Sequence, residues 1–138
     1  MKKIKFSILI AALGLMLIAG FQASAQTDVP RISIKELKDM MDKKTPVIII
    51  DVQPKEIYAK GHIRGAISMP AGRQIELEDV WSLPSDRPIV TYCDCGPGES
   101  DSLYAAKQLM RFGFDDVKVL SDPSIKGWIE AKYPITKK

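Results

Sequence analysis

The amino-acid sequence predicts one α/β domain with a mostly parallel sheet. Strand-like apolar segments over residues 47–50, 89–92 and 117–120 alternate at short spacing with segments of helical periodicity, which is the pattern of a parallel α/β fold. The first of these segments is an unbroken β-branched run, typical of a strand covered on both faces. The chain has 138 residues, and without its leader it is long enough for one compact domain and too short for two.

The first 25 residues have the three parts of a secretory signal peptide. Three lysines lie among the first five residues, an apolar core follows at 8–18, and Ala23-Ser24-Ala25 supplies a small-residue cleavage pattern. An uncleaved membrane anchor is the alternative, but the apolar run is shorter than the ~20 residues that a bilayer span needs. We therefore expect residues 1–25 to be removed after Ala25. The mature chain would begin at Gln26 and be periplasmic or secreted.

The charge of the mature chain is balanced. The leader carries three of the 20 lysines and arginines, which leaves 17 basic residues against 17 acidic ones. The slight basicity of the full sequence therefore belongs to the leader. We expect no nucleic-acid partner and no membrane partner after cleavage, and the sequence leaves the oligomeric state open.

The first half of the mature chain begins with a short lead. We expect residues 26–31 to be disordered and the domain to span residues 32–138. Ser33 and Glu36 form a capping-box pattern that predicts a helix through Met41. The elements expected next are a strand at 47–50, a short helical turn at 54–60, a strand at 66–69 and a weak helix at 74–81.

The second half repeats the alternation of strand and helix. A strand at 89–92 leads into a helix at 102–112, which Gly113 is placed to end in a left-handed conformation. A last strand at 117–120 and a last helix at 125–132 complete the domain. The aromatic residues expected in the core are Trp81, Phe114 and Trp128.

Both cysteines lie in the segment that joins the strand at 89–92 to its helix. Its residues run Tyr92-Cys93-Asp94-Cys95-Gly96-Pro97-Gly98-Glu99-Ser100. Backbone N–H groups and the helix dipole favour a thiolate in such a loop, and the two glycines permit tight curvature around a sulfur. Cysteines two residues apart cannot join distant parts of a fold, so their role is chemical rather than structural. We expect no metal and no cofactor.

Several motifs, taken in order, resemble the rhodanese (sulfurtransferase) domain between about residues 32 and 135. They are Asp51-Val52, Tyr58, Gly61-His62-Ile63-Arg64-Gly65-Ala66 with Ile67 and Pro70, Tyr92-Cys93, Lys126-Gly127-Trp128 and Ala131-Lys132-Tyr133-Pro134. The resemblance implies a three-layer α/β domain with a mostly parallel five-stranded sheet flanked by helices.

The same resemblance implies an activity for Cys93. In the family, the cysteine at this position takes a sulfane sulfur from a small-molecule or protein donor and passes it to a thiol acceptor. The reaction needs a thiolate and then an anionic persulfide. Backbone N–H groups curled around the sulfur at a helix N-terminus stabilise both without a general base.

The loop departs from the family pattern in its charge. The family loop carries a cation before the helix, whereas Asp94, Glu99 and Asp101 are the only charged residues between Cys93 and Leu103. If these carboxylates surround the sulfur, they raise the pKa of the thiol and repel anionic donors. We therefore expect thiosulfate to be a poor donor, and we expect replacement of Glu99 by a cation to improve its use.

Four residues outside the loop are candidates for supporting roles. Asp51, at the end of a strand, is expected to orient the loop rather than transfer protons. His62 is the only histidine, and the resemblance places it in a structural turn, although a Cys–His pair is the alternative. Arg64 and Arg73 are candidates for the cation that the loop lacks, with solvated surface positions as the alternative.

Two other classes of function remain open beside sulfur transfer. Cys93 and Cys95 could work together as a thiol–disulfide couple, with Cys95 as the resolving thiol. Alternatively, the domain could be catalytically silent and use the loop for protein contact. The reactivity of Cys93 separates enzyme from binding module, and the need for Cys95 separates sulfur transfer from redox chemistry.

Overall fold

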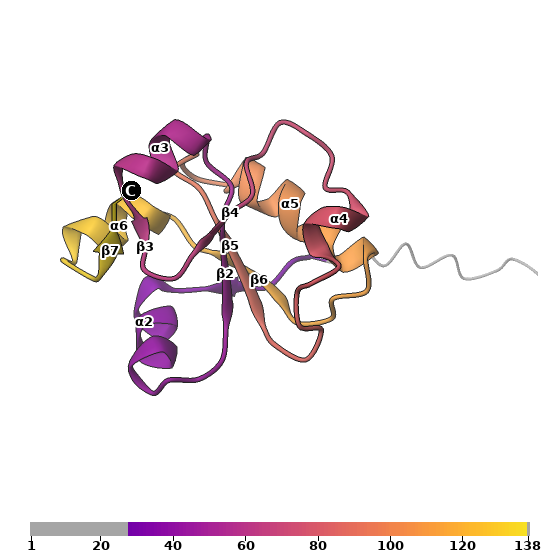
Figure 1. Cartoon of the computed structure of the whole chain (residues 1–138). Coiled ribbons are helices and arrows are strands. Elements are labelled where there is room, and N and C mark those ends of the chain that lie inside the picture. The colour runs from indigo at the N-terminus through magenta and orange to yellow at the C-terminus, as the bar shows by residue number, and fades with distance from the viewer. Residues whose placement is uncertain (1–27, 138) are drawn as a thin grey trace, which may run out of the picture.

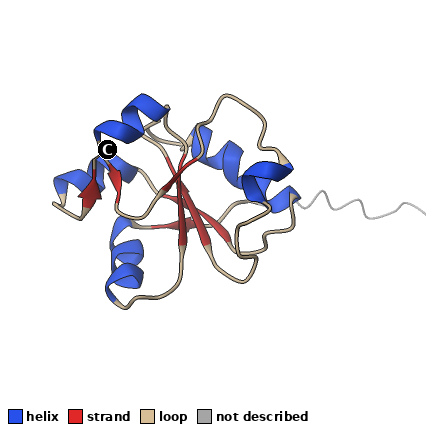
Figure 2. Ribbon diagram, in the orientation of Figure 1, coloured by secondary structure: helices blue, strands red, loops and turns tan. Residues whose placement is uncertain are grey.

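The computed structural model describes residues 28–137, which form an α/β domain (Figures 1 and 2). The strands are β1 (Arg31–Ile32), β2 (Ile48–Asp51), β3 (His62–Ile63), β4 (Ile67–Ser68), β5 (Ile89–Tyr92), β6 (Val117–Leu120) and β7 (Ile135–Thr136). The helices are α2 (Ile34–Asp42), α3 (Lys55–Lys60), α4 (Leu77–Val80), α5 (Ser100–Arg111) and α6 (Ser124–Glu130).

The main sheet has five strands in the order β1-β6-β5-β2-β4, and every neighbouring pair is parallel. In register, Asp51 at the end of β2 lies beside Tyr92 at the end of β5. The strands β3 and β7 form a separate antiparallel pair. The predicted fold class, a five-stranded parallel sheet flanked by helices, is confirmed.

Two hydrophobic clusters fill the two sides of the sheet, because successive strand residues point to opposite faces. In β2, Ile50 packs in the cluster that contains Leu109 of α5. Its neighbour Ile49 packs in the other cluster, with Leu37 of α2 and Trp128 of α6. All four residues of β2 and of β5 are buried, which explains why both strands begin with consecutive apolar residues rather than alternating with polar ones.

The local sequence signals at the start of α2 and at the end of α5 are confirmed. Ser33 accepts a hydrogen bond from the N–H of Glu36, and the Glu36 carboxylate accepts one from Ser33 N–H, as the capping box predicted. Gly113 has φ of 91° after α5, which places it in the left-handed region. The leader lies outside the described residues. No helix in the described part is long and apolar enough to cross a bilayer.

The structure differs from the sequence predictions at the lead and at one tryptophan. Within the expected disordered lead, Val29 is 1% exposed in the core and Arg31 begins β1 beside Val119, so the fold includes these residues. Two-residue strands such as β1, β3 and β7 are too short to carry a periodicity. Trp81 is 78% exposed rather than buried, whereas Phe114 and Trp128 lie in the core.

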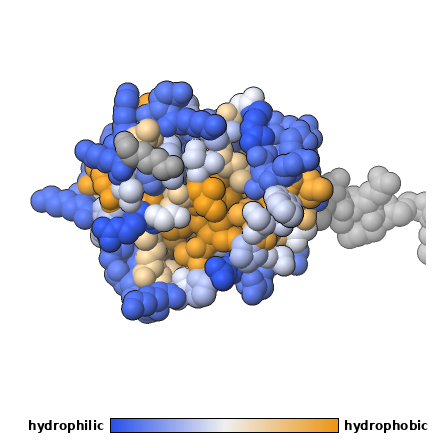
Figure 3. All heavy atoms as spheres, viewed as in Figure 1, coloured by the Kyte–Doolittle hydropathy of each residue, from blue (hydrophilic) through white to orange (hydrophobic). Residues whose placement is uncertain are grey.

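Figure 3 shows hydrophobic residues gathered at the centre of one face, with hydrophilic residues around them.

Candidate active site

The cysteine loop lies at the carboxyl end of the central strand β5. Cys93 directly follows Tyr92, the last residue of β5, and α5 begins at Ser100. In Figure 1 the carboxyl ends of β2 and β5 point toward α3 and the beginning of α5. The carboxyl ends of parallel strands are where open α/β sheets bind their ligands. The topology therefore places Cys93 at the edge of the sheet where chemistry is expected.

The two cysteines are joined by a disulfide bond, with their Cα atoms 5.5 Å apart. Cys93 is 3% exposed, and Cys95 is half-buried against the same hydrophobic cluster. The Cys93 Sγ lies 3.5 Å from the Ser102 Oγ in the first turn of α5. The Ser102 hydroxyl in turn donates to the carbonyl of Glu99 at 3.0 Å. A reduced Cys93 thiol can donate its proton to Ser102, so this serine is a direct neighbour of the reactive atom.

The loop after Cys93 has a curled backbone. Gly96, Gly98 and Glu99 all have positive φ, at 72°, 92° and 45°. The N–H groups of Asp94, Cys95 and Gly96 donate to no acceptor within the described residues. Unpaired N–H groups in a loop of this shape can stabilise an anionic sulfur. The remaining loop residues, Pro97 and Ser100, are exposed.

The carboxylate of Glu99 is buried and paired with groups other than the cysteines, which differs from the expectation of a free charge beside the thiol. Its side chain is 8% exposed and forms an ion pair with Arg31, with Nε donating to Oε2 at 3.1 Å. Its other oxygen accepts from the N–H of Asp122 at 2.9 Å. The carboxylate thus ties the end of the loop to β1 and to the segment after β6. Asp94 and Asp101 are exposed, so the acidic character of the loop rests on these two.

Asp51 is fully buried and takes part in a hydrogen-bond network that joins three strands. Its carboxylate accepts from Tyr92 Oη at 2.6 Å, from Gln53 N–H at 2.8 Å and from the Gln53 side chain at 3.2 Å. Tyr92 Oη also accepts from Ile63 N–H at 3.0 Å. Burial raises the pKa of Asp51, although its hydrogen bonds oppose that rise. Burial and the Asp51 charge raise the pKa of Tyr92. The network holds the end of β2 against the end of β5, and a role of Asp51 in orienting the cysteine loop stays a prediction.

The other three supporting candidates do not contact the cysteines. The buried His62 stacks on Tyr58 with ring centroids 3.7 Å apart, and its Nδ1 lies 2.8 Å from the Tyr58 carbonyl. Arg64 is exposed. Arg73 forms a two-pronged ion pair with Asp79, at 2.6 Å for each contact. The histidine therefore has the structural surroundings that the resemblance implied, and Arg73 already has a carboxylate partner.

A groove of about 520 Å³ adjoins the loop at Asp94. Three lysines line it, and none of them forms an ion pair within the described residues. Four isoleucines supply apolar walls, and the carboxylates of Asp94 and Glu130 also line the groove, so hydrophobic surface lies beside charges of both signs with lysines in excess. It supplies beside the loop the cations that are missing within it. The lysines are Lys60, Lys126 and Lys137, and the isoleucines are Ile57, Ile125, Ile129 and Ile135.

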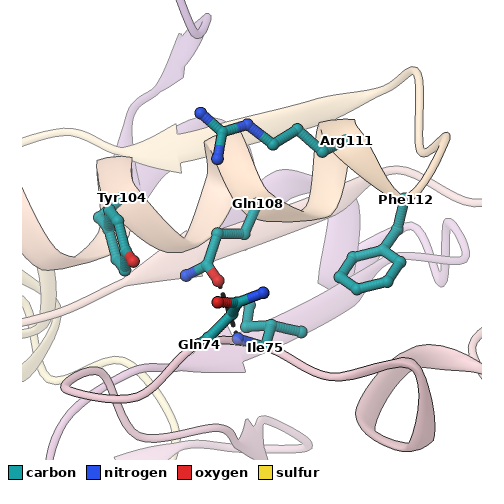
Figure 4. A pocket seen from close by; sticks show the side chains of 6 residues that line it. All are labelled: Gln74, Ile75, Tyr104, Gln108, Arg111 and Phe112. Atoms are coloured by element: carbon teal, nitrogen blue, oxygen red, sulfur yellow. Dashed lines mark hydrogen bonds between the residues drawn. The ribbon is translucent and has the colours of Figure 1, made fainter.

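A second, smaller pocket of about 190 Å³ lies along α5 (Figure 4). Gln108 is 6% exposed there, and its Oε1 accepts from the N–H of Ile75 at 2.8 Å. The figure shows Tyr104, Gln108 and Arg111 on the same helix, with Gln74 and Ile75 beside the end of the Gln108 side chain. The hydrogen bond holds the segment before α4 against α5, which explains a buried glutamine without a catalytic role.

Sequence reasoning missed three features of the site. Ser102 lies nine residues after Cys93, yet the first turn of α5 returns it to the sulfur. The ion pair of Arg31 with Glu99 spans 68 positions and has no local signature. The lysines of the groove come from α3, α6 and the C-terminal segment. The position of Glu99 directly before α5, with no basic residue near it in sequence, was the one signal that could have suggested a distant basic partner.

A five-stranded parallel sheet with a cysteine loop between β5 and α5 defines an α/β domain that places a cysteine at the carboxyl edge of its sheet. Residues 33–131 match the Rhodanese-like domain family. The chain belongs to this family.

The relatives agree with this assignment. The chain is 31% identical over 116 residues to the probable adenylyltransferase/sulfurtransferase MoeZ of Mycobacterium tuberculosis. The matched region covers 84% of this chain and 28% of that protein. The chain therefore spans less than a third of that relative. A Bacillus halodurans protein has a TM-score of 0.70 at 26% identity, covering 78% and 77% of the two chains. The Rhodanese-like domain of an Anabaena protein has a TM-score of 0.63 at 26% identity, covering 80% and 81%.

Proposed function

We propose that this protein is a sulfurtransferase in which Cys93 takes a sulfane sulfur from a donor and passes it to a thiol acceptor. The observation that carries the proposal is the position of Cys93, at the end of β5 and before the N-terminus of α5. The N–H groups of the three residues that follow it have no acceptor within the described residues. An anionic thiolate or persulfide at this place gains hydrogen bonds and a favourable helix dipole.

The chemistry follows from these contacts. The Cys93 thiolate attacks the outer sulfur of a donor, a new S–S bond forms, and the donor leaves as an anion. The resulting Cys93 persulfide then gives its outer sulfur to the thiolate of an acceptor. The groove beside Asp94 lies next to the loop, and its lysines favour a donor or acceptor that carries negative charge and apolar groups.

A second candidate, a thiol–disulfide couple, is favoured by one observation, which is the bond between Cys93 and Cys95. Such a pair exchanges electrons with external thiols without carrying sulfur. We propose export to an oxidising compartment from the leader over residues 1–25, and a disulfide can persist in such a compartment.

The experiment compares reduced Cys93→Ser and Cys95→Ser proteins after incubation with a low-molecular-weight persulfide. Intact-mass spectrometry is expected to show one added sulfur atom on Cys95→Ser and none on Cys93→Ser. Absence of added sulfur from Cys95→Ser would overturn sulfur transfer by Cys93. Rapid oxidation of wild-type protein by external disulfides, without any sulfur gain in the variants, would then support the redox couple.

A further inference from the structure

The disulfide shows that the loop brings the Cys95 sulfur into bonding contact with the Cys93 sulfur. The two Cα atoms are 5.5 Å apart across one intervening residue. Cys93 is 3% exposed and Cys95 is half-buried, so Cys95 is the sulfur nearer to solvent. When Cys93 carries a persulfide, Cys95 is the thiol that its own chain places beside it.

We propose that Cys95 discharges the Cys93 persulfide within the loop and releases hydrosulfide, so that the protein converts sulfane sulfur to sulfide. The proposal rests on the proposed function, because it requires a persulfide on Cys93. It assigns a role in the reaction to Cys95, and it makes the observed disulfide a product of turnover.

The step balances in atoms and electrons. The Cys95 thiolate attacks the inner sulfur of the persulfide, which is the Cys93 Sγ. The Cys93–Cys95 bond forms while the bond from Cys93 Sγ to the outer sulfur breaks, and the outer sulfur leaves with the electron pair as HS⁻. The outer sulfur is reduced by two electrons, and the two cysteine sulfurs are oxidised by one electron each. An external dithiol then reduces the disulfide and is itself oxidised to a disulfide.

The geometry favours this step when no thiol acceptor is present. Cys95 is held in the same loop, so its reaction is intramolecular and carries no cost of bringing two molecules together. Hydrosulfide is a better leaving group than a cysteine thiolate, because its conjugate acid is the stronger acid. The loop is held at its far end by the buried Glu99 carboxylate, through Arg31 and the N–H of Asp122. This anchoring restricts the loop and keeps the two sulfurs near each other.

The environment of Cys93 also fits its role as the sulfur under attack. Ser102 Oγ lies 3.5 Å from Cys93 Sγ, and the N–H groups of Asp94, Cys95 and Gly96 have no acceptor in the described structure. The three N–H groups can stabilise the charge of the persulfide before the step and of the departing hydrosulfide during it. The half-buried side chain of Cys95 covers Cys93 in the product, which protects that sulfur from further oxidation.

The test is a single turnover without added thiol. Reduced wild-type, Cys95→Ser and Cys95→Ala proteins are treated with one equivalent of glutathione persulfide, and both released sulfide and intact mass are followed over time. Wild-type protein is expected to release about one equivalent of sulfide and to finish as the disulfide. Both variants are expected to keep the added sulfur, with a persulfide lifetime at least roughly tenfold longer.

The outcomes separate this proposal from the proposed function. Wild-type protein that keeps its persulfide, or variants that release sulfide as fast as wild type, would overturn the role of Cys95 while leaving sulfur transfer by Cys93 intact. Variants that never gain sulfur would overturn both. When a dithiol has reduced the spent wild-type protein and has been removed, a second equivalent of glutathione persulfide is expected to release a second equivalent of sulfide. Failure to do so would overturn the cycle.

Discussion

Replacement of Tyr92 by phenylalanine tests the network that holds the ends of β2 and β5 together. The variant removes the donor to Asp51 and the acceptor of the Ile63 N–H, and both partners are fully buried. A hydrogen bond to a charged group contributes roughly 1.5–3 kcal/mol, and an orphaned buried N–H costs roughly 1–3 kcal/mol. Since Asp51 keeps two bonds from Gln53, we expect the free energy of unfolding to fall by about 3 kcal/mol.

The destabilisation should depend on pH. The native pKa of Asp51 is raised by burial, so the native state binds more protons than the unfolded state between the ordinary aspartate pKa of about 3.9 and the raised value. Stability therefore falls as the pH rises through that window. The Tyr92 hydrogen bond lowers the Asp51 pKa, so its loss raises this pKa further and widens the window. The difference between variant and wild type should grow with pH and shrink toward pH 4.

The assay is urea unfolding followed by circular dichroism at several pH values between about 4 and 8, since the slope and midpoint give the free energy of unfolding. Tyr104→Phe is the matched control, because Tyr104 is 52% exposed and its hydroxyl has no hydrogen bond within the described residues. It should leave stability unchanged at every pH. A Tyr92→Phe effect below about 1 kcal/mol, or one that does not change with pH, would refute the reasoning.

Three further predictions concern the loop, α6 and the leader. Glu99→Lys should lower the melting temperature, because it places a second cation beside Arg31, and it should not improve thiosulfate turnover. An unchanged melting temperature with faster turnover would contradict the structure. Gly127→Ala should destabilise the fold by roughly 1–3 kcal/mol, since a Cβ would lie 2.5 Å from the Pro123 Cγ, and thermal unfolding measures it. Full-length protein expressed in a Gram-negative host should yield a periplasmic species whose N-terminal sequence begins at Gln26; intact protein recovered in the membrane would indicate an anchor.

Much of the fold could be predicted from local sequence. The apolar runs of β2 and β5 identified two central parallel strands because both faces of each strand are buried. Ser33 and Glu36 identified the start of α2 because a capping box is complete within four residues. Arg31 could not be assigned to β1 in this way, since a two-residue strand is defined by its partner β6 and not by its own pattern.

The parts of the candidate site that lie close together in the sequence could be predicted. The contacts between residues that are distant in the sequence could not. The spacing of Cys93 and Cys95 and their position between a strand and a helix were enough to predict a reactive site. The direction in which Glu99 points depends on Arg31, which is 68 positions away, so charge alone gave the wrong neighbour for this carboxylate. The buried bond from Tyr92 to Asp51 likewise depends on the register of two strands that are distant in sequence.

The central claim is that Cys93 carries the transferred sulfur, and isotope labelling tests it most directly. Reduced Cys95→Ser protein is treated with a persulfide whose outer sulfur is isotopically labelled, alkylated and digested, and the peptide that contains Cys93 is analysed by mass spectrometry. The account predicts the labelled sulfur on Cys93, and its quantitative loss to an added thiol acceptor. An unlabelled Cys93 peptide, in protein whose thiol is reduced and accessible to alkylation, would contradict the account.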